Sequence, residues 1–331
     1  MKILVFGKDG QLGKAFKTIF DVKNLEAQHR IHYVGRPQCD LVNATSISDV
    51  LNHYKPNLII NTAAYTAVDK AETEIKLAFA INANAPEIMA QYAVAHGGTL
   101  LHYSTDYVFD GHKSGFYTED DMCNPLSIYG KSKIAGEEAI EGTFKNFPVK
   151  SRSSSQARYA ILRTSWVYGN GVNFIRTILR LAKEREELKI ISDQHGVPTS
   201  AQWLAGVSLD LVLGEDGQLQ RFSSGIYHAV PSGQTTWYGL ASLAIESAVE
   251  AGVNLKVKLD AIKPILAVEY PLPAPRPMNT LMATDKLRRV LANSQSKVSN
   301  PYNDPNVVPD FPLWDSIVRE YIGTLVVEKV I

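Results

Sequence analysis

The residues best suited to do chemistry in this sequence are Tyr129 and Lys133, the only Tyr-x-x-x-Lys pair in the chain. In a helix, residues four apart share one face, with Cβ atoms about 5–6 Å from each other. An ammonium at that distance favours the phenolate, so we expect Lys133 to lower the pKa of Tyr129 from about 10 toward neutral pH. Such a phenol can exchange a proton with a sugar or alcohol oxygen. The expected reaction is reduction of a carbonyl by a nicotinamide; the alternative is an exposed helical pair with no role in catalysis.

A glycine motif near the N-terminus provides a site for that nicotinamide cofactor. Residues 2–6 predict a buried parallel strand, and Gly7-x-x-Gly10-x-x-Gly13 follows it directly and opens a helix through Phe20. Glycines allow a tight turn, close approach of a pyrophosphate to backbone N–H groups, and close packing of helix on sheet. The motif is a variant of the dinucleotide-binding fingerprint, and the alternative is a tight turn without a ligand.

The end of the second predicted strand, 31–34, bears on the choice between NADH and NADPH. NAD-preferring enzymes place an acidic residue there to bind the ribose hydroxyls. This sequence has Gly35 and then Arg36. An arginine can pair with the 2′-phosphate, so NADPH is favoured over NADH. Arg36 fits a solvated surface cation equally well, and the choice stays open.

The remaining elements must bring these residues to one edge of a sheet. Small residues follow the predicted strand 58–61, and Ser104-Thr105-Asp106 follows the strand 99–103, so both groups are expected at the same carboxyl edge. Other expected strands and helices are strands 159–163, 188–191 and 226–229, and helices 70–96, 129–141, 173–187, 201–213 and 235–251.

This pattern predicts an α/β fold with a Rossmann-type doubly wound parallel sheet and a smaller α/β substrate-binding domain. Residues 1–165, with later segments that return to them, are expected to bind NAD(P). Residues 166–331 are expected to bind mainly the substrate. A length of 331 residues is sufficient for both parts.

Composition narrows the possible partners and compartment. The formal net charge is zero, so there is no electrostatic case for a nucleic acid or an acidic membrane as partner. No run of about 18 uncharged apolar residues predicts a membrane span. Two cysteines, Cys39 and Cys123, do not make a disulfide framework, so reduced thiols and a cytoplasmic protein are expected. The basic, Ser-rich stretch 145–158 fits a solvated loop.

Four motifs together resemble the extended short-chain dehydrogenase/reductases. They are the glycine loop, Ser-Thr-Asp-Tyr-Val-Phe at 104–109, Tyr-Gly-Lys-Ser-Lys at 129–133 and Arg-Thr-Ser-Trp-Val-Tyr at 163–168. Within that family the chain is similar to the enzymes that reduce a dTDP-bound 4-keto-6-deoxy sugar. Stretches at 66–72, 181–185, 194–199 and 276–279 extend the match over nearly the whole chain.

The resemblance implies a Thr-Tyr-Lys catalytic set. Tyr129 would donate a proton to the C4 oxygen, Lys133 would hold the nicotinamide ribose, and Thr105 would bond the substrate oxygen and the phenol. The implied substrate contacts are Thr105, Asp106, Trp166 and Arg276, although buried core is the alternative for Trp166. The implied cofactor contacts are Gly10, Gln11, Leu12, Asp40, Leu41, Ala64, Tyr65, Thr66, Tyr103, Tyr129 and Lys133.

The chain departs from the family at a magnesium site. Some members are dimers held by magnesium on carboxylates, but the matching positions here are Ala15 and Gln202, which offer no anionic oxygen. We therefore expect no metal, and a monomer or weak homodimer. Two other functions remain open: reduction of a different nucleotide-4-ketosugar, and a non-catalytic, cofactor-binding regulatory subunit.

Overall fold

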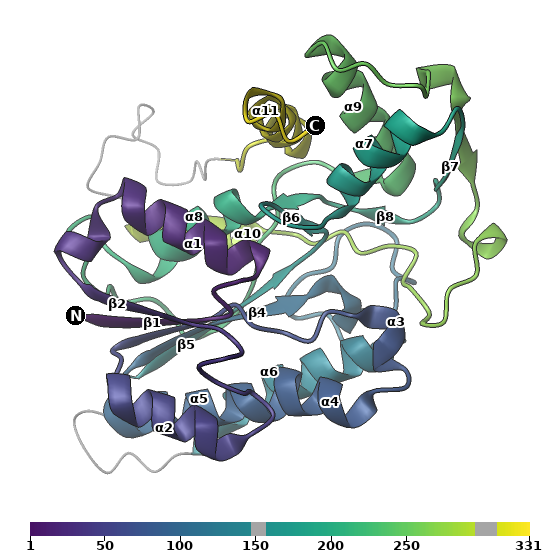
Figure 1. The fold of residues 1–331 in the computed structure, drawn as a ribbon. Coiled ribbons are helices and arrows are strands. Elements are labelled where there is room, and N and C mark those ends of the chain that lie inside the picture. The colour runs from purple at the N-terminus through teal and green to yellow at the C-terminus, as the bar shows by residue number, and fades with distance from the viewer. Residues whose placement is uncertain (147–156, 295–309) are drawn as a thin grey trace.

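A parallel sheet forms the centre of the molecule (Figure 1). The computed structural model describes residues 1–146, 157–294 and 310–331. Within these residues the large sheet has six strands: β1 (Lys2–Phe6), β2 (Arg30–Val34), β3 (Leu58–Asn61), β4 (Thr99–Thr105), β5 (Arg158–Thr164) and β10 (Gly225–His228). Their order in space is β10-β5-β4-β3-β1-β2, and every pair is parallel. The order reverses between β1 and β3, where ligands bind in open α/β sheets.

Helices cover both faces of this sheet, so the predicted doubly wound architecture is confirmed. In β1, Ile3 and Val5 point to one face, and Leu4 and Phe6 point to the other. The first face packs against α1 (Gln11–Val22), α8 (Ala201–Val212) and α10 (Asp285–Ser294). The second packs against α2 (Ala44–Tyr54), α5 (Ala85–His96) and α6 (Ile128–Asn146). Burial on both faces explains why these strands are apolar throughout.

The predicted continuous helix over 70–96 is wrong, because the chain there forms several shorter segments. They are α3 (Val68–Ala71), α4 (Ile75–Phe79), the π-helical η2 (Ala80–Asn84) and then α5. The wide π turn carries Asn82, whose side chain accepts from Tyr65 N at 2.9 Å and donates to Tyr65 O at 3.0 Å. It also donates to Ser132 Oγ on α6 at 2.9 Å. The π turn thus satisfies the polar backbone of the loop that follows β3.

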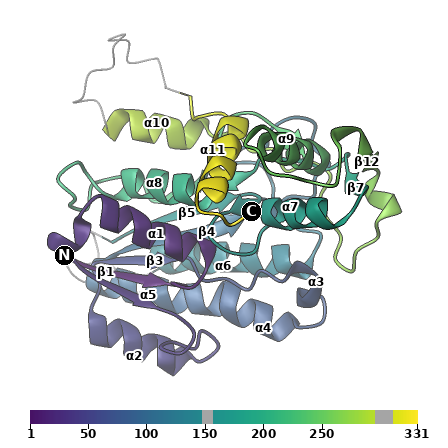
Figure 2. The same cartoon turned by 45° about the horizontal axis from the view of Figure 1, so that its top comes forward.

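A smaller part of the molecule lies beyond the carboxyl edge of the large sheet (Figure 2). Its core joins α7 (Phe174–Glu184), α9 (Trp237–Glu250) and α11 (Trp314–Val327). Short strands pair around these helices: β6 (Val167–Tyr168) with β9 (Thr199–Ser200), β7 (Leu188–Ile191) with β12 (Ile262–Ile265), and β8 (His195–Gly196) with β11 (Thr235–Thr236). Between these elements the chain returns to the large sheet through α8, β10 and α10.

Short 3-10 helices complete the described chain: η1 (Leu25–Ala27), η3 (Asp106–Val108), η5 (Leu259–Ala261) and η6 (Ala267–Glu269). Helix α6 is longer than the predicted 129–141. Most of the basic, Ser-rich stretch, residues 147–156, lies outside the described residues. In the part of the chain that the structure describes, no helix has the length and apolar character needed to cross a membrane.

Candidate active site

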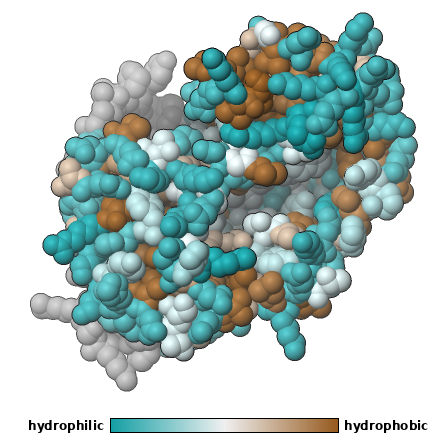
Figure 3. All heavy atoms as spheres, viewed as in Figure 1, coloured by the Kyte–Doolittle hydropathy of each residue, from teal (hydrophilic) through white to brown (hydrophobic). Residues whose placement is uncertain are grey.

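A cavity of about 940 Å³ lies at the carboxyl edge of the large sheet. The surface is visibly hollowed between the part built on this sheet and the part that carries α7 and α9 (Figure 3). Most of the site residues predicted from the sequence line the cavity: Gly7, Gly10, Gln11, Leu12, Arg36, Asp40, Leu41, Ala64, Thr66, Tyr103, Thr105, Asp106, Tyr129, Lys133 and Trp166. Gly13, Tyr65 and Arg276 do not belong to this lining.

The glycine loop has the shape that a pyrophosphate requires. Gly7 has φ +84, and a Cβ added at Gly13 would lie 2.2 Å from the carbonyl oxygen of Gly7. Gly13 therefore acts by letting α1 pack closely rather than by facing the cavity. No side chain caps the first turn of α1, whose N-cap is Gly10. The backbone N–H groups of that turn can therefore bind an anion.

Two residues that line this cavity carry buried polar atoms without a protein partner. Among the described residues, Ser104 Oγ and Thr164 Oγ1 make no hydrogen bond within the protein, and both residues line the cavity. Unpaired buried polar atoms are costly, so they indicate a polar ligand. Together with the glycine loop, they fit a dinucleotide that ends near Tyr129.

Tyr129, from the first turn of α6, meets Thr105, from the end of β4, in this cavity. The Thr105 hydroxyl donates to Asp106 Oδ1 at 2.8 Å and accepts from Tyr107 N at 3.2 Å. Burial raises the pKa of Tyr129 to about 12; a hydrogen bond with Thr105 lowers this pKa, and the charge of Asp106 raises it. The phenol therefore keeps its proton at neutral pH, as a proton donor must.

The expected lowering of the Tyr129 pKa by Lys133 is wrong for this structure. Lys133 Nζ donates to the carbonyl oxygen of Tyr103 at 2.6 Å and lies 3.4 Å from His102 Nε2. Burial also lowers the pKa of Lys133 to about 8. Because burial disfavours the charged form of each residue, it moves the pKa of Tyr129 away from neutral pH and the pKa of Lys133 toward it.

Asp106 also carries a perturbed carboxyl group. It is 2% exposed, and burial raises its pKa to about 6, against the opposing effect of hydrogen bonds from Thr280 and Thr105. With a pKa of about 6, this carboxyl at the cavity wall is mostly charged at pH 7, where it accepts hydrogen bonds, and it becomes able to donate one as the pH falls to 6 and below. This behaviour suits recognition of a sugar hydroxyl.

Both roles considered for Trp166, a substrate contact and a packed core residue, have support in the structure. The residue lines the cavity, and its ring also stacks on Trp237 at 3.7 Å between centroids. Its backbone is left-handed, with φ 46. A Cβ added at Gly196 would lie 2.6 Å from the Trp166 ring, so Gly196 makes room for the indole. Packing thus fixes the face that Trp166 presents to the cavity.

Arg276 and Tyr65 are engaged elsewhere. The Arg276 guanidinium makes a two-point ion pair with Asp69, each bond 2.8 Å long, and also donates to Ala274 O at 2.6 Å. The Tyr65 hydroxyl donates to Glu74 at 2.7 Å. Neither side chain lines the cavity, and each is held by an acidic residue.

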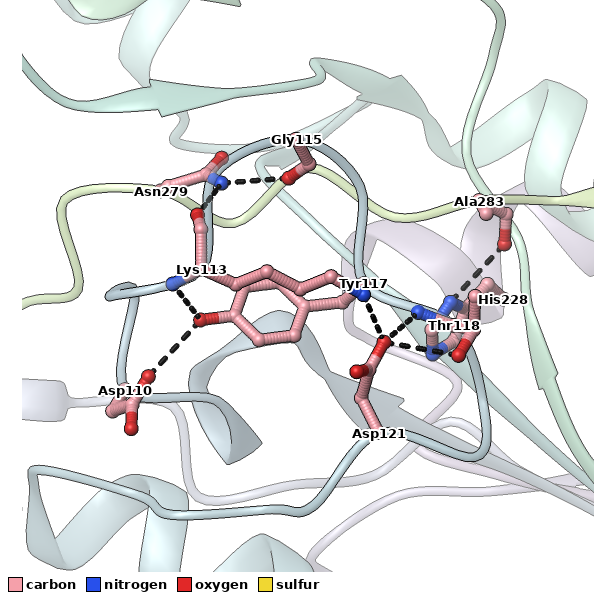
Figure 4. A network of polar contacts seen from close by, with 9 residues as sticks. All are labelled: Asp110, Lys113, Gly115, Tyr117, Thr118, Asp121, His228, Asn279 and Ala283. Atoms are coloured by element: carbon pink, nitrogen blue, oxygen red, sulfur yellow. Dashed lines mark hydrogen bonds and ion pairs between the residues drawn. The ribbon is translucent and has the colours of Figure 1, made fainter.

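The polar loop after β4 is pinned to the C-terminal segment (Figure 4). Asn279 Nδ2 donates to Lys113 O and Gly115 O, each at 2.7 Å. Tyr117 N donates to Leu281 O at 2.7 Å, and the Tyr117 hydroxyl donates to Asp110 at 3.0 Å. These bonds hold the loop at the edge of the sheet that also carries Thr105.

The positions of the family's magnesium ligands lie on neighbouring helices. Ala15 is buried on α1, and Gln202 is exposed on α8. Across residues 1–146, 157–294 and 310–331, no group of three or more His, Cys, Asp or Glu side chains is arranged to hold a metal ion.

Sequence reasoning missed two buried polar residues behind the cavity, Asn61 and His102. Asn61 ends β3, His102 lies in β4, and Asn61 Nδ2 is 3.0 Å from His102 Nδ1. The available signal was a polar residue directly after the apolar run of each strand, 58–60 in β3 and 100–101 in β4, where an unpaired side chain would be costly.

Comparison with known proteins places this arrangement among reductases. Residues 1–300 match the model of a family described as the RmlD substrate binding domain. A dTDP-4-dehydrorhamnose reductase of Escherichia coli K12 is 40% identical over 297 residues, which cover 88% of this chain and 92% of the relative.

Two solved structures of enzymes with the same name are similar over almost their full length. The one from Clostridium acetobutylicum has a TM-score of 0.79 and 31% identity, covering 98% of this chain and 99% of that chain. The one from Bacillus anthracis, in complex with NADP, has a TM-score of 0.76 and 29% identity, covering 97% and 98%.

Proposed function

The chain belongs to the family of the RmlD substrate binding domain, and from this membership we propose that it reduces dTDP-4-dehydro-6-deoxy-L-mannose (dTDP-4-dehydrorhamnose) to dTDP-L-rhamnose with NAD(P)H. The observation that carries the proposal is the meeting of Thr105, Tyr129 and Lys133 in the cavity that the glycine loop also lines. The E. coli relative bears the name of this activity.

The residues of the chain have separate tasks in this reaction. The N-terminus of α1 binds the pyrophosphate, and Lys133, which lines the same cavity, holds the nicotinamide ribose. The bound cofactor supplies the hydride that reaches C4 of the sugar. Tyr129 donates its phenolic proton to the C4 oxygen, and Thr105 orients that oxygen. A positioned acid contributes about 10²–10⁴-fold to the rate.

We infer that NADPH is preferred to NADH. Arg36 lines the cavity directly after β2, where the adenosine ribose lies in this fold. The aliphatic chain of Lys8 passes close by, since a Cβ added at Gly35 would lie 3.1 Å from Lys8 Cε. Two cations at this point favour a 2′-phosphate, although Asp9 adds an opposing charge 2.3 Å from the same Cβ position.

On the substrate side, we propose that Thr105, Asp106 and Trp166 contact the sugar. Residues 166–331 supply mainly this side of the cleft, and residues 1–165 with the returning segments bind the cofactor. Arg276 can reach a substrate only if its pair with Asp69 opens or if the substrate binds beside that pair. We further propose that no metal takes part and that the protein is a monomer or weak homodimer. The free thiols of Cys39 and Cys123 support a cytoplasmic setting.

The experiment is turnover of the dTDP-ketosugar with NADPH and with NADH, followed by absorbance, with the C4 configuration of the product determined by NMR. We expect dTDP-L-rhamnose and consumption of cofactor only when the sugar is present. A folded, cofactor-binding sample without turnover would refute the proposal and favour a regulatory subunit. Turnover to the opposite C4 configuration, or only with another nucleotide, would favour a reductase of a different ketosugar.

A further inference from the structure

A buried chain of three polar side chains runs from β3 through β4 to α6, on the protein side of the cavity. Asn61, His102 and Lys133 are 1%, 1% and 2% exposed. Asn61 Nδ2 lies 3.0 Å from His102 Nδ1, and His102 Nε2 lies 3.4 Å from Lys133 Nζ. The proposed reaction uses Lys133 but gives no role to Asn61 or His102.

The orientation of the Asn61 amide follows from its neighbour in the backbone. Asn61 Oδ1 accepts a hydrogen bond from Ala63 N at 3.2 Å. A backbone N–H can only donate, so the oxygen must face Ala63 and the NH₂ group must face His102. Asn61 therefore donates to His102 Nδ1.

The tautomer of His102 follows in turn. Burial and the neighbouring Lys133 lower the pKa of His102 well below its ordinary value, so the ring is neutral. A neutral imidazole carries one proton, and Nδ1 is already an acceptor. The proton must be on Nε2, which is the nitrogen that faces Lys133.

The proton on His102 Nε2 points toward the amine of Lys133. Lys133 Nζ donates to Tyr103 O at 2.6 Å. An ammonium has donors only, so a charged Lys133 would face the Nε2–H of His102 donor to donor. An uncharged amine has a lone pair that can accept from Nε2–H. We propose that His102, fixed by Asn61 in the tautomer with its proton on Nε2, is a positioning residue that opposes protonation of Lys133.

Other groups near the amine also affect the pKa of Lys133. Glu137, one turn further along α6, raises the pKa of Lys133, while burial lowers it. The carboxylate of Glu137 is itself held by Arg163 of β5 at 2.6 Å. Tyr129 of α6 lines the same cavity and is uncharged at neutral pH. His102 is thus the group on β4 that can change the charge of Lys133 without altering its burial.

The effect of the Lys133 charge on catalysis rests on the proposed function. A phenolate forms as Tyr129 gives up its proton, and an ammonium nearby stabilises that phenolate. The pH at which Lys133 loses its proton should therefore set the alkaline limb of kcat/KM. Asn61 and His102 together shift the alkaline limb of the kcat/KM profile toward neutral pH.

The first test is the tautomer itself, measured on the wild-type protein by long-range ¹H–¹⁵N NMR of His102. We expect the Nε2–H form at neutral pH, and the Nδ1–H form would overturn the inference. This readout needs no turnover, so it separates failure of this inference from failure of the proposed function.

The second test reverses the hydrogen bonds. In Asn61→Asp, the carboxylate accepts from both Ala63 N and Nδ1–H, so Nε2 becomes an acceptor for the ammonium. We expect NMR to show the Nδ1–H tautomer and the alkaline limb of kcat/KM to move up by about one pH unit. His102→Gln is the control without added charge, because its amide oxygen can accept from Lys133; its limb should move in the same direction. Unchanged limbs in both variants, with cofactor binding retained, would refute the proposal.

Discussion

Lys133 Nζ donates to the carbonyl oxygen of Tyr103 at 2.6 Å, so the helix that carries Tyr129 is bonded to the strand that ends in Thr105. Both partners are buried, which makes this bond stronger than one in water. Tyr129, the proposed general acid, and the Thr105 hydroxyl, proposed to orient the substrate, therefore belong to one rigid unit.

Replacing Tyr129 by phenylalanine removes the proposed proton donor and keeps the ring. We expect kcat to fall by about 10²–10⁴-fold, since that is the usual contribution of a positioned acid. The affinity for NADPH should change little. Measurement of kcat together with the NADPH dissociation constant checks both statements. A kcat within about tenfold of the wild-type value would mean that another group donates the proton.

Replacing Asp106 by asparagine should stabilise the protein at neutral pH. The folded-state pKa of about 6 is above the ordinary 3.8, so the folded state holds its proton more tightly than the unfolded chain. The charged carboxylate thus costs stability as pH rises from 4 through 6, by up to about 3 kcal/mol. Urea unfolding at pH 4 and pH 7 should show a gain in the variant only at pH 7. A gain of equal size at both pH values would contradict this account. Activity should fall, because Asp106 is proposed to contact the sugar.

Replacing Glu137 by glutamine breaks a buried ion pair. Arg163 and Glu137 are 2% and 1% exposed at their side chains, and Arg163 also donates to Cys123 Sγ at 3.1 Å. An uncompensated buried guanidinium costs about 3–5 kcal/mol. The control is Glu184→Gln, because the Arg180–Glu184 pair is exposed and its loss costs about 1 kcal/mol or less. Similar free energies of unfolding for the two variants would show that burial does not raise the cost of losing the Arg163–Glu137 ion pair.

Replacing Arg36 by alanine tests cofactor preference. A charge-assisted bond to the 2′-phosphate contributes about 1.5–3 kcal/mol, so the affinity for NADPH should fall by about 10–150-fold. The affinity for NADH should stay the same. Lys17→Ala on the solvent side of α1 is the control, because Lys17 pairs with Asp21 and is outside the cavity lining. Equal losses for the two cofactors would remove Arg36 from phosphate recognition.

Replacing Gly13 by alanine should disrupt the glycine loop. The new Cβ would lie 2.2 Å from the Gly7 carbonyl oxygen, so α1 must move away from the turn. We expect weaker binding of both NADPH and NADH and a lower melting temperature. Gly142→Ala in α6 is the control: nothing lies within 4 Å of its Cβ, so it should gain up to about 1 kcal/mol. Unchanged cofactor binding in Gly13→Ala would contradict the close packing.

Local patterns in the sequence determined much of the architecture. Apolar runs predicted β1 and β3 as buried strands, and the glycine motif placed the turn between β1 and α1. These features depend on residues close in sequence, because strand burial and tight turns follow from local periodicity and backbone freedom. For the same reason the spacing of Tyr129 and Lys133 placed both on one helix.

Tertiary structure decided the chemical state of that pair. Lys133 turns to Tyr103 and His102, and burial raises the pKa of Tyr129 instead of letting the lysine lower it. The stretch 70–96, predicted as one helix, forms several shorter segments in the folded chain. Arg276, predicted to contact the substrate, is paired with Asp69. In each case the deciding partner lies on another element of the fold, so the spacing of residues along the chain does not predict it. Desolvation depends on everything packed around a group, which only the folded chain defines.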